Sequence, residues 1–317
     1  MLPRRILLAA PFVLAAAPAR AAWPERPIRL IVPVAPAGPT DIAARVIAAP
    51  LGPLLGTNVV VENRPGGGGN VGTAAVANGP ADGYTMLMGS FSNAANPAMF
   101  TDLPFDQKRD LVAVAQVTRV PLILTVHPGL PVQNIQELVA LAKQRSLTYA
   151  TGGVGTSAHL AGEMFVRQAG IQVPAAHYRG AAPANTDLAA GLVAFMFDNP
   201  QTALPLIAAG RVRPIAVTVM ERIPELPEVP TAIESGMPDL AVASWHGIFM
   251  RSGTPREIIL RINRDVNAAL QTAEVRERFK ALGVQPGSGT PEEFAAFFAS
   301  EMERWGRVIR EAGIKPE

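Results

Sequence analysis

Two loops of small residues are the parts of this 317-residue chain best suited to chemistry, and that chemistry is anion binding. The first is Ala37-Gly38-Pro39-Thr40-Asp41, and the second runs from Thr151 to Ser157 (TGGVGTS). Each lies between an expected strand and an expected helix, where unpaired backbone N–H groups and the helix dipole attract anions. Glycine also lets the backbone approach a ligand closely. The pattern predicts that the two loops bind a carboxylate from opposite sides. The alternative is that both are ordinary strand-to-helix turns, which have the same composition.

The usual catalytic and metal-binding motifs are absent from the sequence. There is no G-x-S-x-G elbow, no H-E-x-x-H and no P-loop. The chain has no cysteine, which excludes disulfides, Cys-ligated zinc, iron–sulfur clusters and thiol nucleophiles. His159 and Glu163 have helical i,i+4 spacing, but one such pair is a weak metal signal. We therefore expect a protein without enzymatic activity, catalytic residues, metal or cofactor; the alternative is an exported enzyme that uses His159 or His246.

The segment Gly67-x-Gly69-x-x-Gly72 matches the dinucleotide-binding fingerprint. It follows the second expected strand instead of the first, and no acidic residue lies about 20 positions beyond Gly72. We interpret it as a mobile turn and do not expect NAD.

Positive charge is concentrated at the N-terminus. The chain carries a formal net charge of +2, but Arg4, Arg5 and Arg20 are followed by no acid within residues 1–22, and the remainder has 25 basic and 26 acidic residues. Ile6–Ala17 is apolar and Ala19-Arg20-Ala21 fits a cleavage site, so residues 1–22 are predicted to be a signal peptide for export to the periplasm. Export by the general or the twin-arginine route stays open. The near-neutral remainder argues against a nucleic-acid partner.

Alternating strands and helices are expected in the mature chain. Strands over 28–34, 59–61 and 84–88 enclose a helix that Thr40 or Asp41 caps and that runs to about Leu55, an order typical of a parallel sheet. Residues 111–126 are rich in β-formers and contain Pro121, which predicts two strands meeting at a bend. The alternation then restarts in a second unit of about 120 residues, in which 157–168 is an expected helix.

Two long helices are expected near the C-terminus. Thr254–Glu257 and Thr290–Glu293 have capping-box spacing with Pro at the first helical position, which predicts helices over about 255–271 and 291–310. The second carries large apolar residues at helical spacing, which we interpret as core: Phe294, Phe297, Phe298, Met302, Trp305 and Ile309.

A series of short motifs runs in order along the mature chain, and no single one is specific. They are Trp23-Pro24, Pro27-Ile28, Gly38-Pro39-Thr40-Asp41 with Arg45, Val60–Gly66, Ala81–Thr85, Gly153–Thr156, His159–Glu163, Tyr178-Arg179-Gly180, Asp187-Leu188, Met196-Phe197-Asp198 and Leu226–Thr231. As an ordered set they are highly specific. From Trp23 almost to the C-terminus, the chain resembles the receptor family of tripartite tricarboxylate transporters, the Bug-type periplasmic solute-binding proteins.

The resemblance implies a type II periplasmic-binding-protein fold, in which two doubly wound α/β domains are joined by two crossover segments. We place the crossings near Pro121 and Ala243. The first domain is then discontinuous, residues 23–120 plus 243–317, and the second is 121–242.

The resemblance also implies a function and a set of ligand-binding residues. A small carboxylated solute binds between the domains and is delivered to the membrane subunits of a tripartite tricarboxylate-type transporter; a sensor co-receptor with the same fold is an alternative. We expect a monomer. The implied ligand-binding residues are Ala37, Gly38, Thr40, Asp41, Ser90, Ser92 and Asn93 in the first domain, and Thr151, Gly153, Gly155, Thr156, Ser157, Arg179, Gly180 and Asp198 in the second.

Overall fold

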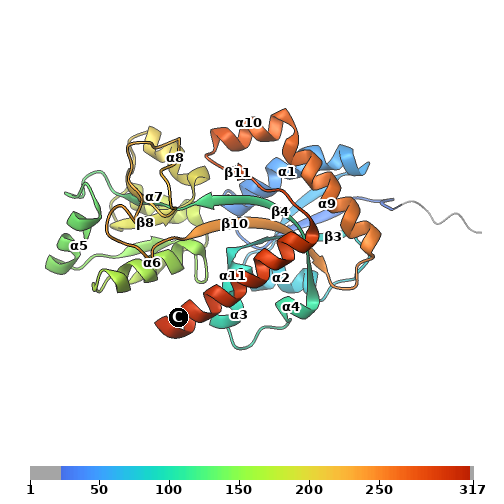
Figure 1. Ribbon diagram of the computed structural model, residues 1–317, viewed down its shortest axis with the longest axis horizontal. Helices are drawn as coiled ribbons and strands as arrows, with labels where there is room; N and C mark the ends of the chain where they lie inside the picture. The colour runs from blue at the N-terminus through green and yellow to red at the C-terminus, as the bar shows by residue number, and fades with distance from the viewer. Residues whose placement is uncertain (1–22, 315–317) are drawn as a thin grey trace, which may run out of the picture.

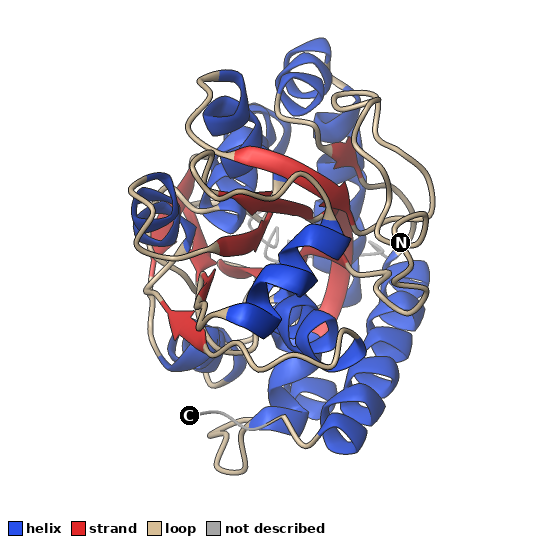
Figure 2. Cartoon of the chain, turned by 90° about the vertical axis from the view of Figure 1, so that its left-hand side faces the viewer, coloured by secondary structure: helices blue, strands red, loops and turns tan. Residues whose placement is uncertain are grey.

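Two β-sheets flanked by helices form the part of the chain that the computed structural model describes, residues 23–314 (Figures 1 and 2). The predicted signal peptide, residues 1–22, lies outside the described residues. Within residues 23–314, no helix has the length and apolar character that a membrane span requires.

The first sheet has six strands in the order β11-β4-β10-β3-β1-β2. Its strands are β1 (Ile28–Val32), β2 (Val59–Asn63), β3 (Thr85–Ser90), β4 (Leu111–Pro121), β10 (Ala243–Arg251) and β11 (Gln285–Pro286). β1 pairs in parallel with β2 and β3, whereas β10 runs antiparallel to β3 and β4.

Helices cover both faces of this sheet, which explains why β1 is apolar at every position except the exposed Arg29. Leu30 packs in the cluster formed with α1 (Pro39–Leu55), α9 (Arg256–Gln271) and α10 (Ala273–Ala281). Ile31 points to the other face, which packs against α2 (Asn70–Ala77), α3 (Phe91–Met99) and α11 (Pro291–Ala312). A strand buried on both faces needs apolar residues at successive positions. The short helix α4 (Gln107–Asp110) precedes β4, and a 3-10 turn, η1 (Gly67–Gly69), precedes α2.

The second sheet has five strands in the order β7-β6-β8-β5-β9. They are β5 (Ile123–Val126), β6 (Tyr149–Thr151), β7 (Ala175–His177), β8 (Phe195–Asp198) and β9 (Arg213–Val217). Its helices are α5 (Ile135–Gln144), α6 (Ser157–Gln168), α7 (Ala181–Ala189) and α8 (Pro200–Ala208). β6 is parallel to both β7 and β8, so three neighbouring strands end at the same edge of the sheet.

The chain passes between the sheets at two adjacent places. β4 ends at Pro121 and β5, in the other sheet, begins at Ile123, so the predicted bend at Pro121 is confirmed. The return segment enters β10 at Ala243, which pairs directly with Pro121. Figure 1 shows β4 and β10 lying side by side between the two halves.

Several local expectations differ from the structure. α1 begins at Pro39 with Gly38 as its cap, because proline suits the first helical position, so a cap at Thr40 or Asp41 was wrong. The Thr254 hydroxyl donates to the Arg251 carbonyl instead of capping α9, whereas the Thr290–Glu293 capping box is confirmed. Helices α3, α4, α8 and α10 were not predicted.

The apolar stripe of α11 packs in the core, as predicted. Phe294, Phe298, Trp305 and Ile309 are buried, and Phe297 and Met302 pack against them half-buried. The Trp245 ring on β10 lies edge-on to Phe294 and Phe298, with centroids 6.0 and 5.9 Å apart. Glu301 accepts hydrogen bonds from the indoles of both Trp245 and Trp305 at 3.1 Å, which fixes α11 against β10.

Gly162 tests the packing of α6 on the second sheet. A methyl group at this position would collide with the ring of Tyr149, which is fully buried on β6. Gly162→Ala should therefore lower the free energy of unfolding by about 1–3 kcal/mol through overpacking, although alanine is the better helix former.

Gly306→Ala in α11 is the matched control. Its methyl group would meet only the guanidinium end of the exposed Arg310, which can move. We expect this variant to be unchanged or up to about 1 kcal/mol more stable in denaturant unfolding. If Gly162→Ala is as stable as Gly306→Ala, the packing of α6 described here is wrong.

Candidate functional site

A small cavity of about 70 Å³ lies between the two halves of the chain, and we call it the central cavity. The six-stranded half contributes Val34, Ala35, Gly38, Pro39, Thr40, Ser90, Phe91, Ser92, Ser244 and His246. The five-stranded half contributes Gly152, Thr156, Ser157, Ala158, Gly180, Ala181, Met196, Asp198 and Asn199. Both halves thus form its wall.

Five helices begin at this cavity. The lining includes the cap or first-turn residues of α1, α3, α6, α7 and α8, each of which follows a strand of its sheet. The first N–H groups of a helix have no partner within it, and the helix dipole places partial positive charge there. The arrangement is therefore suited to an anion such as a carboxylate.

Basic side chains are absent from the described wall of the central cavity. His246 does line it, but both ring nitrogens contact threonine hydroxyls, Nδ1 with Thr118 at 2.7 Å and Nε2 with Thr40 at 3.1 Å. Burial lowers the pKa of His246 to about 4, so the ring is neutral near pH 7. An anion in the cavity would depend on backbone N–H groups and hydroxyls for its hydrogen bonds.

The 151–157 loop is held in shape by its own side chains. The Thr151 hydroxyl accepts from the Gly153 N–H at 3.1 Å, and the Thr156 hydroxyl donates to the Gly153 carbonyl at 2.8 Å. Thr156 also caps α6 by accepting from the His159 N–H. Nδ1 of His159 accepts from the Gly155 N–H at 3.3 Å. The start of α6 is thereby fixed toward the cavity.

Asp41 holds the loop before α1 in shape. Its carboxylate accepts from the Ala37 N–H at 3.0 Å, from Arg45 at 2.9 Å and from the Asn63 amide at 2.8 Å. Burial acts to raise the pKa of Asp41, but these hydrogen bonds, led by Arg45, hold it below its usual value. Asp41 is thus an ionised anchor for the loop, and Ala37 adopts a positive φ of 63° beside it.

The two halves touch each other around the cavity. A methyl group on Gly155 would collide with Oδ1 of Asn96 on α3, and one on Gly68 would come within 3.2 Å of the Val154 carbonyl. One on Gly180 would lie 3.6 Å from the Ala35 side chain. The loops of the five-stranded half therefore pack directly on the six-stranded half, as expected of a closed cleft.

A wider space of about 510 Å³, which we call the outer chamber, adjoins the central cavity. The two share Val34, Ala35, Ser92, Gly152, Thr156 and Gly180. Arg179 lines only the outer chamber, together with His177 and the glycines of the 66–69 turn. Gly72, the last glycine of the fingerprint, packs against Pro33, where a methyl group would come within 2.8 Å of the backbone.

The predicted site residues divide according to where they lie. Gly38, Thr40, Ser90, Ser92, Thr156, Ser157, Gly180 and Asp198 line the central cavity, and Gly153 and Arg179 line the outer chamber. Asn93 lines a smaller hollow beside Ser90, where its side chain accepts from the Ser90 N–H at 2.9 Å. Ala37, Asp41, Thr151 and Gly155 line neither space and instead shape or brace the loops.

Other lining residues were not predicted. Ala158, Ala181 and Asn199 occupy helix starts next to predicted loops, so extending each loop into the first helical turn would have found Ala158 and Ala181. Ser244 and His246 come from β10, and no local sequence signal places that strand under the cavity; His246 was named only for the alternative of an exported enzyme.

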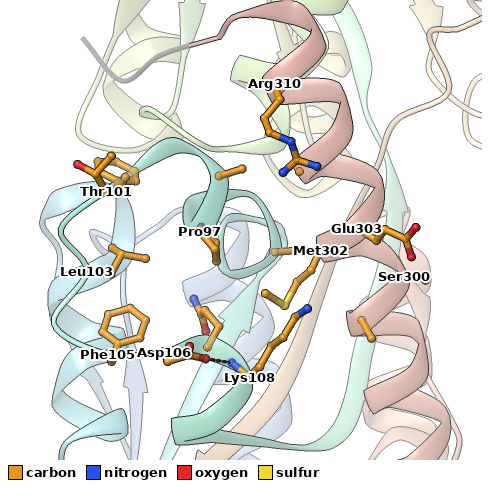
Figure 3. Close-up of a pocket in the computed structure, with 16 residues that line it drawn as sticks. Pro97, Thr101, Leu103, Phe105, Asp106, Lys108, Ser300, Met302, Glu303 and Arg310 are labelled. Atoms are coloured by element: carbon orange, nitrogen blue, oxygen red, sulfur yellow. Dashed lines mark hydrogen bonds between the residues drawn. The ribbon is translucent and has the colours of Figure 1, made fainter.

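A larger hollow of about 860 Å³ lies away from these loops, between α3, the segment before β4 and α11. Figure 3 shows Leu103 and Phe105 on one side and Met302 and Glu303 of α11 on the other, with Lys108 between them. Its charged residues include Asp106 and Glu303 as well as Lys108 and Arg310, so its charge does not single out an anion. We therefore place the candidate site in the central cavity.

Histidines and acids do not assemble into a metal site within the described residues. Glu163 accepts a hydrogen bond from the Tyr149 hydroxyl at 2.7 Å, so its spacing from His159 serves packing. His159 is buried, with its ring edge-on to His177 at a centroid distance of 4.7 Å. Burial, with a smaller contribution from His177, lowers the pKa of His159 to about 4.

Comparison with known proteins assigns the chain to a protein family. The model of the tripartite tricarboxylate transporter family receptor matches residues 43–314. BugT of Bordetella pertussis is 39% identical over 297 residues, covering 92% of this chain and 91% of BugT.

Solved structures agree with this assignment. The structure of R. palustris Rpa4515 with adipate is 37% identical, with a TM-score of 0.90 over 93% of this chain and all of that one. The periplasmic binding protein BugD is 32% identical, with a TM-score of 0.89 and coverage of 93% and 100%. MatC from Rhodopseudomonas palustris with bound malate is 30% identical, with a TM-score of 0.87 and coverage of 90% and 100%. These likenesses confirm the predicted type II periplasmic-binding-protein fold. The chain belongs to the receptor family of tripartite tricarboxylate transporters, the Bug-type periplasmic solute-binding proteins.

Proposed function

We propose that this protein captures a small carboxylated solute in the central cavity and delivers it to the membrane subunits of a tripartite tricarboxylate-type transporter. The observation that carries the proposal is the convergence of five helix N-termini on a cavity between the two halves whose described wall has no Lys or Arg. Relatives at 37% and 30% identity, solved with adipate and with malate, support a carboxylate as the ligand. Capture before transport fits removal of residues 1–22 on export to the periplasm.

Ligand entry requires the two halves to separate, and the paired connections at Pro121 and Ala243 are suited to act as the hinge. Thr218 holds both connections together: its hydroxyl accepts from the Leu122 N–H at 3.0 Å and donates to the Val242 carbonyl. We infer that residues 23–120 with 243–314 and residues 121–242 move as two domains about this point. A solute that bridges both loops then stabilises the closed state.

The histidines near the cavity support binding without chemistry. A general base works best with a pKa close to the working pH, whereas burial lowers the pKa of His246 and of His159 to about 4. Both nitrogens of His246 also contact threonine hydroxyls. We therefore assign His246 to the structure of the cavity wall.

Direct binding tests the proposed function. Protein that has been unfolded, dialysed and refolded should bind at least one of succinate, malate, aspartate, adipate and citrate stoichiometrically in calorimetry, with a melting temperature that rises with ligand concentration. The acid should be recovered unchanged by NMR. Turnover of the acid, or no binding by any of the five, contradicts the proposal.

Gly155→Ala tests whether the halves close on the ligand as described. The methyl group would collide with Asn96 across the cleft only in the closed state, so affinity should fall by about tenfold or more while the fold is kept.

Gly170→Ala is the control, because Gly170 also has a positive φ of 60° but has no neighbour within 4 Å of an added methyl group. It carries the same backbone strain of about 1–2 kcal/mol without the contact across the cleft. If the two variants bind the ligand with equal affinity, Gly155 does not contact the other half in the closed state.

The buried state of His246 is tested by the pH dependence of stability. Between pH 6.5 and about 4 the unfolded chain takes up a proton at this position and the folded protein does not, so stability falls as the pH falls through this range. His246→Gln should show a shallower dependence, by up to about 1.4 kcal/mol per pH unit. Identical slopes in urea titrations from pH 4 to 7 would show that His246 is not held neutral.

A further inference from the structure

Asp198 is an unexpected group in a cavity built for an anion. It ends β8, lines the central cavity and is only 1% exposed. Oδ1 accepts from the Asn199 N–H at 2.8 Å and from the Thr202 hydroxyl at 2.7 Å, while Oδ2 accepts from the Asn185 amide at 2.7 Å. A carboxylate has about four acceptor positions, so Oδ2 keeps one free.

Asp198 stays ionised near neutral pH although it is buried. Burial raises its pKa to about 6, and the three hydrogen bonds oppose that rise. Among residues 23–314 it has no Lys, Arg or His partner within ion-pair distance. Asn199 beside it also lines the cavity, is 8% exposed and has an Oδ1 without a hydrogen-bond partner in the described chain. One acceptor position on Oδ2 of Asp198 and Oδ1 of Asn199 are therefore left without a donor on this side of the cavity.

A plain carboxylate would be poorly matched to this wall. Within about 70 Å³, its negative charge would lie close to that of Asp198, and two carboxylates that share a site repel each other. A hydroxyl or ammonium group on a nearby carbon would donate to Asp198 and separate the two charges.

We propose that the central cavity selects carboxylates that carry a hydrogen-bond donor, a hydroxyl or an ammonium group, on a carbon one or two bonds from the bound carboxylate, and that Asp198 accepts from this donor. The inference rests on the proposed function, because it assumes that a carboxylate occupies the helix N-termini. Asp198 is then the residue that determines specificity, and the rest of the solute extends into the outer chamber, which Arg179 lines.

The discrimination should be large. A hydrogen bond to a charged group is among the stronger ones, and a ligand without the donor leaves the remaining acceptor position of Oδ2 unfilled in a buried site. We expect the donor to strengthen binding by about tenfold or more.

Matched acids test this directly in calorimetry at pH 8. The first series is succinate, malate and aspartate, and the second is adipate, 2-hydroxyadipate and 2-aminoadipate, each chiral acid in both forms. In at least one series a substituted acid should bind about tenfold or more tightly than its parent. Tighter binding of the amino acid identifies an ammonium group as the preferred donor, and tighter binding of the hydroxy acid identifies a hydroxyl.

Asp198→Asn should remove most of this preference, because a neutral amide neither attracts the donor as strongly nor repels the parent acid. The parent should bind unchanged or more tightly. Asp187→Asn is the control: Asp187 lies on α7, outside the central cavity, and accepts from the Tyr178 hydroxyl. This variant should keep the full preference.

Parent acids that bind as tightly as substituted ones, or a preference that survives in Asp198→Asn, overturn the inference while leaving carboxylate binding intact. No binding by any acid contradicts the proposed function itself. If circular dichroism shows that Asp198→Asn does not fold, the comparison of parent and substituted acids in the native protein tests the inference alone.

Discussion

The attraction between an anion and unpaired helix N-termini is the interaction on which the proposed site depends. Five helices begin at one cavity, and its described wall has no Lys or Arg that could also bind an anion. Backbone donors are fixed by the fold, so the loops that lead into α1 and α6 must be held in place. Asp41 does this for the first loop, and Thr151, Thr156 and His159 do it for the second.

Topology brings these helix starts together. In each half, parallel strands place the following helix N-termini at one edge of a sheet, and the two edges face each other. The adjacent connections at Pro121 and Ala243 keep the halves joined on one side. Gly155 against Asn96 and Gly180 against Ala35 form the closed contact around the cavity. A receptor can thus bind an anion with a chain whose charge outside residues 1–22 is near zero.

Patterns in short stretches of sequence predicted the parts of this arrangement that depend on residues close together along the chain. The Gly-rich 151–157 loop, the helix 157–168 and the bend at Pro121 all follow from composition and spacing. Helix α3, which carries Pro97 inside it, was missed. Ser244 could not be found, and His246 was named only for the alternative of an exported enzyme, since strand pairing over more than 100 residues brings β10 to the cavity. The contact of Asp41 with Asn63 was also hidden, because Asn63 comes from β2, 22 residues along the chain.

A crystal structure of the protein with a bound acid tests most directly whether neutral donors hold the ligand. We expect a carboxylate in the central cavity with its oxygens about 2.7–3.2 Å from backbone N–H groups at the starts of α1, α6 and α7 and from nearby hydroxyls. No Lys or Arg should touch that carboxylate. A sole carboxylate paired with Arg179 in the outer chamber, or one bound between Lys108 and Arg310 beside α11, would contradict the central role of the helix N-termini.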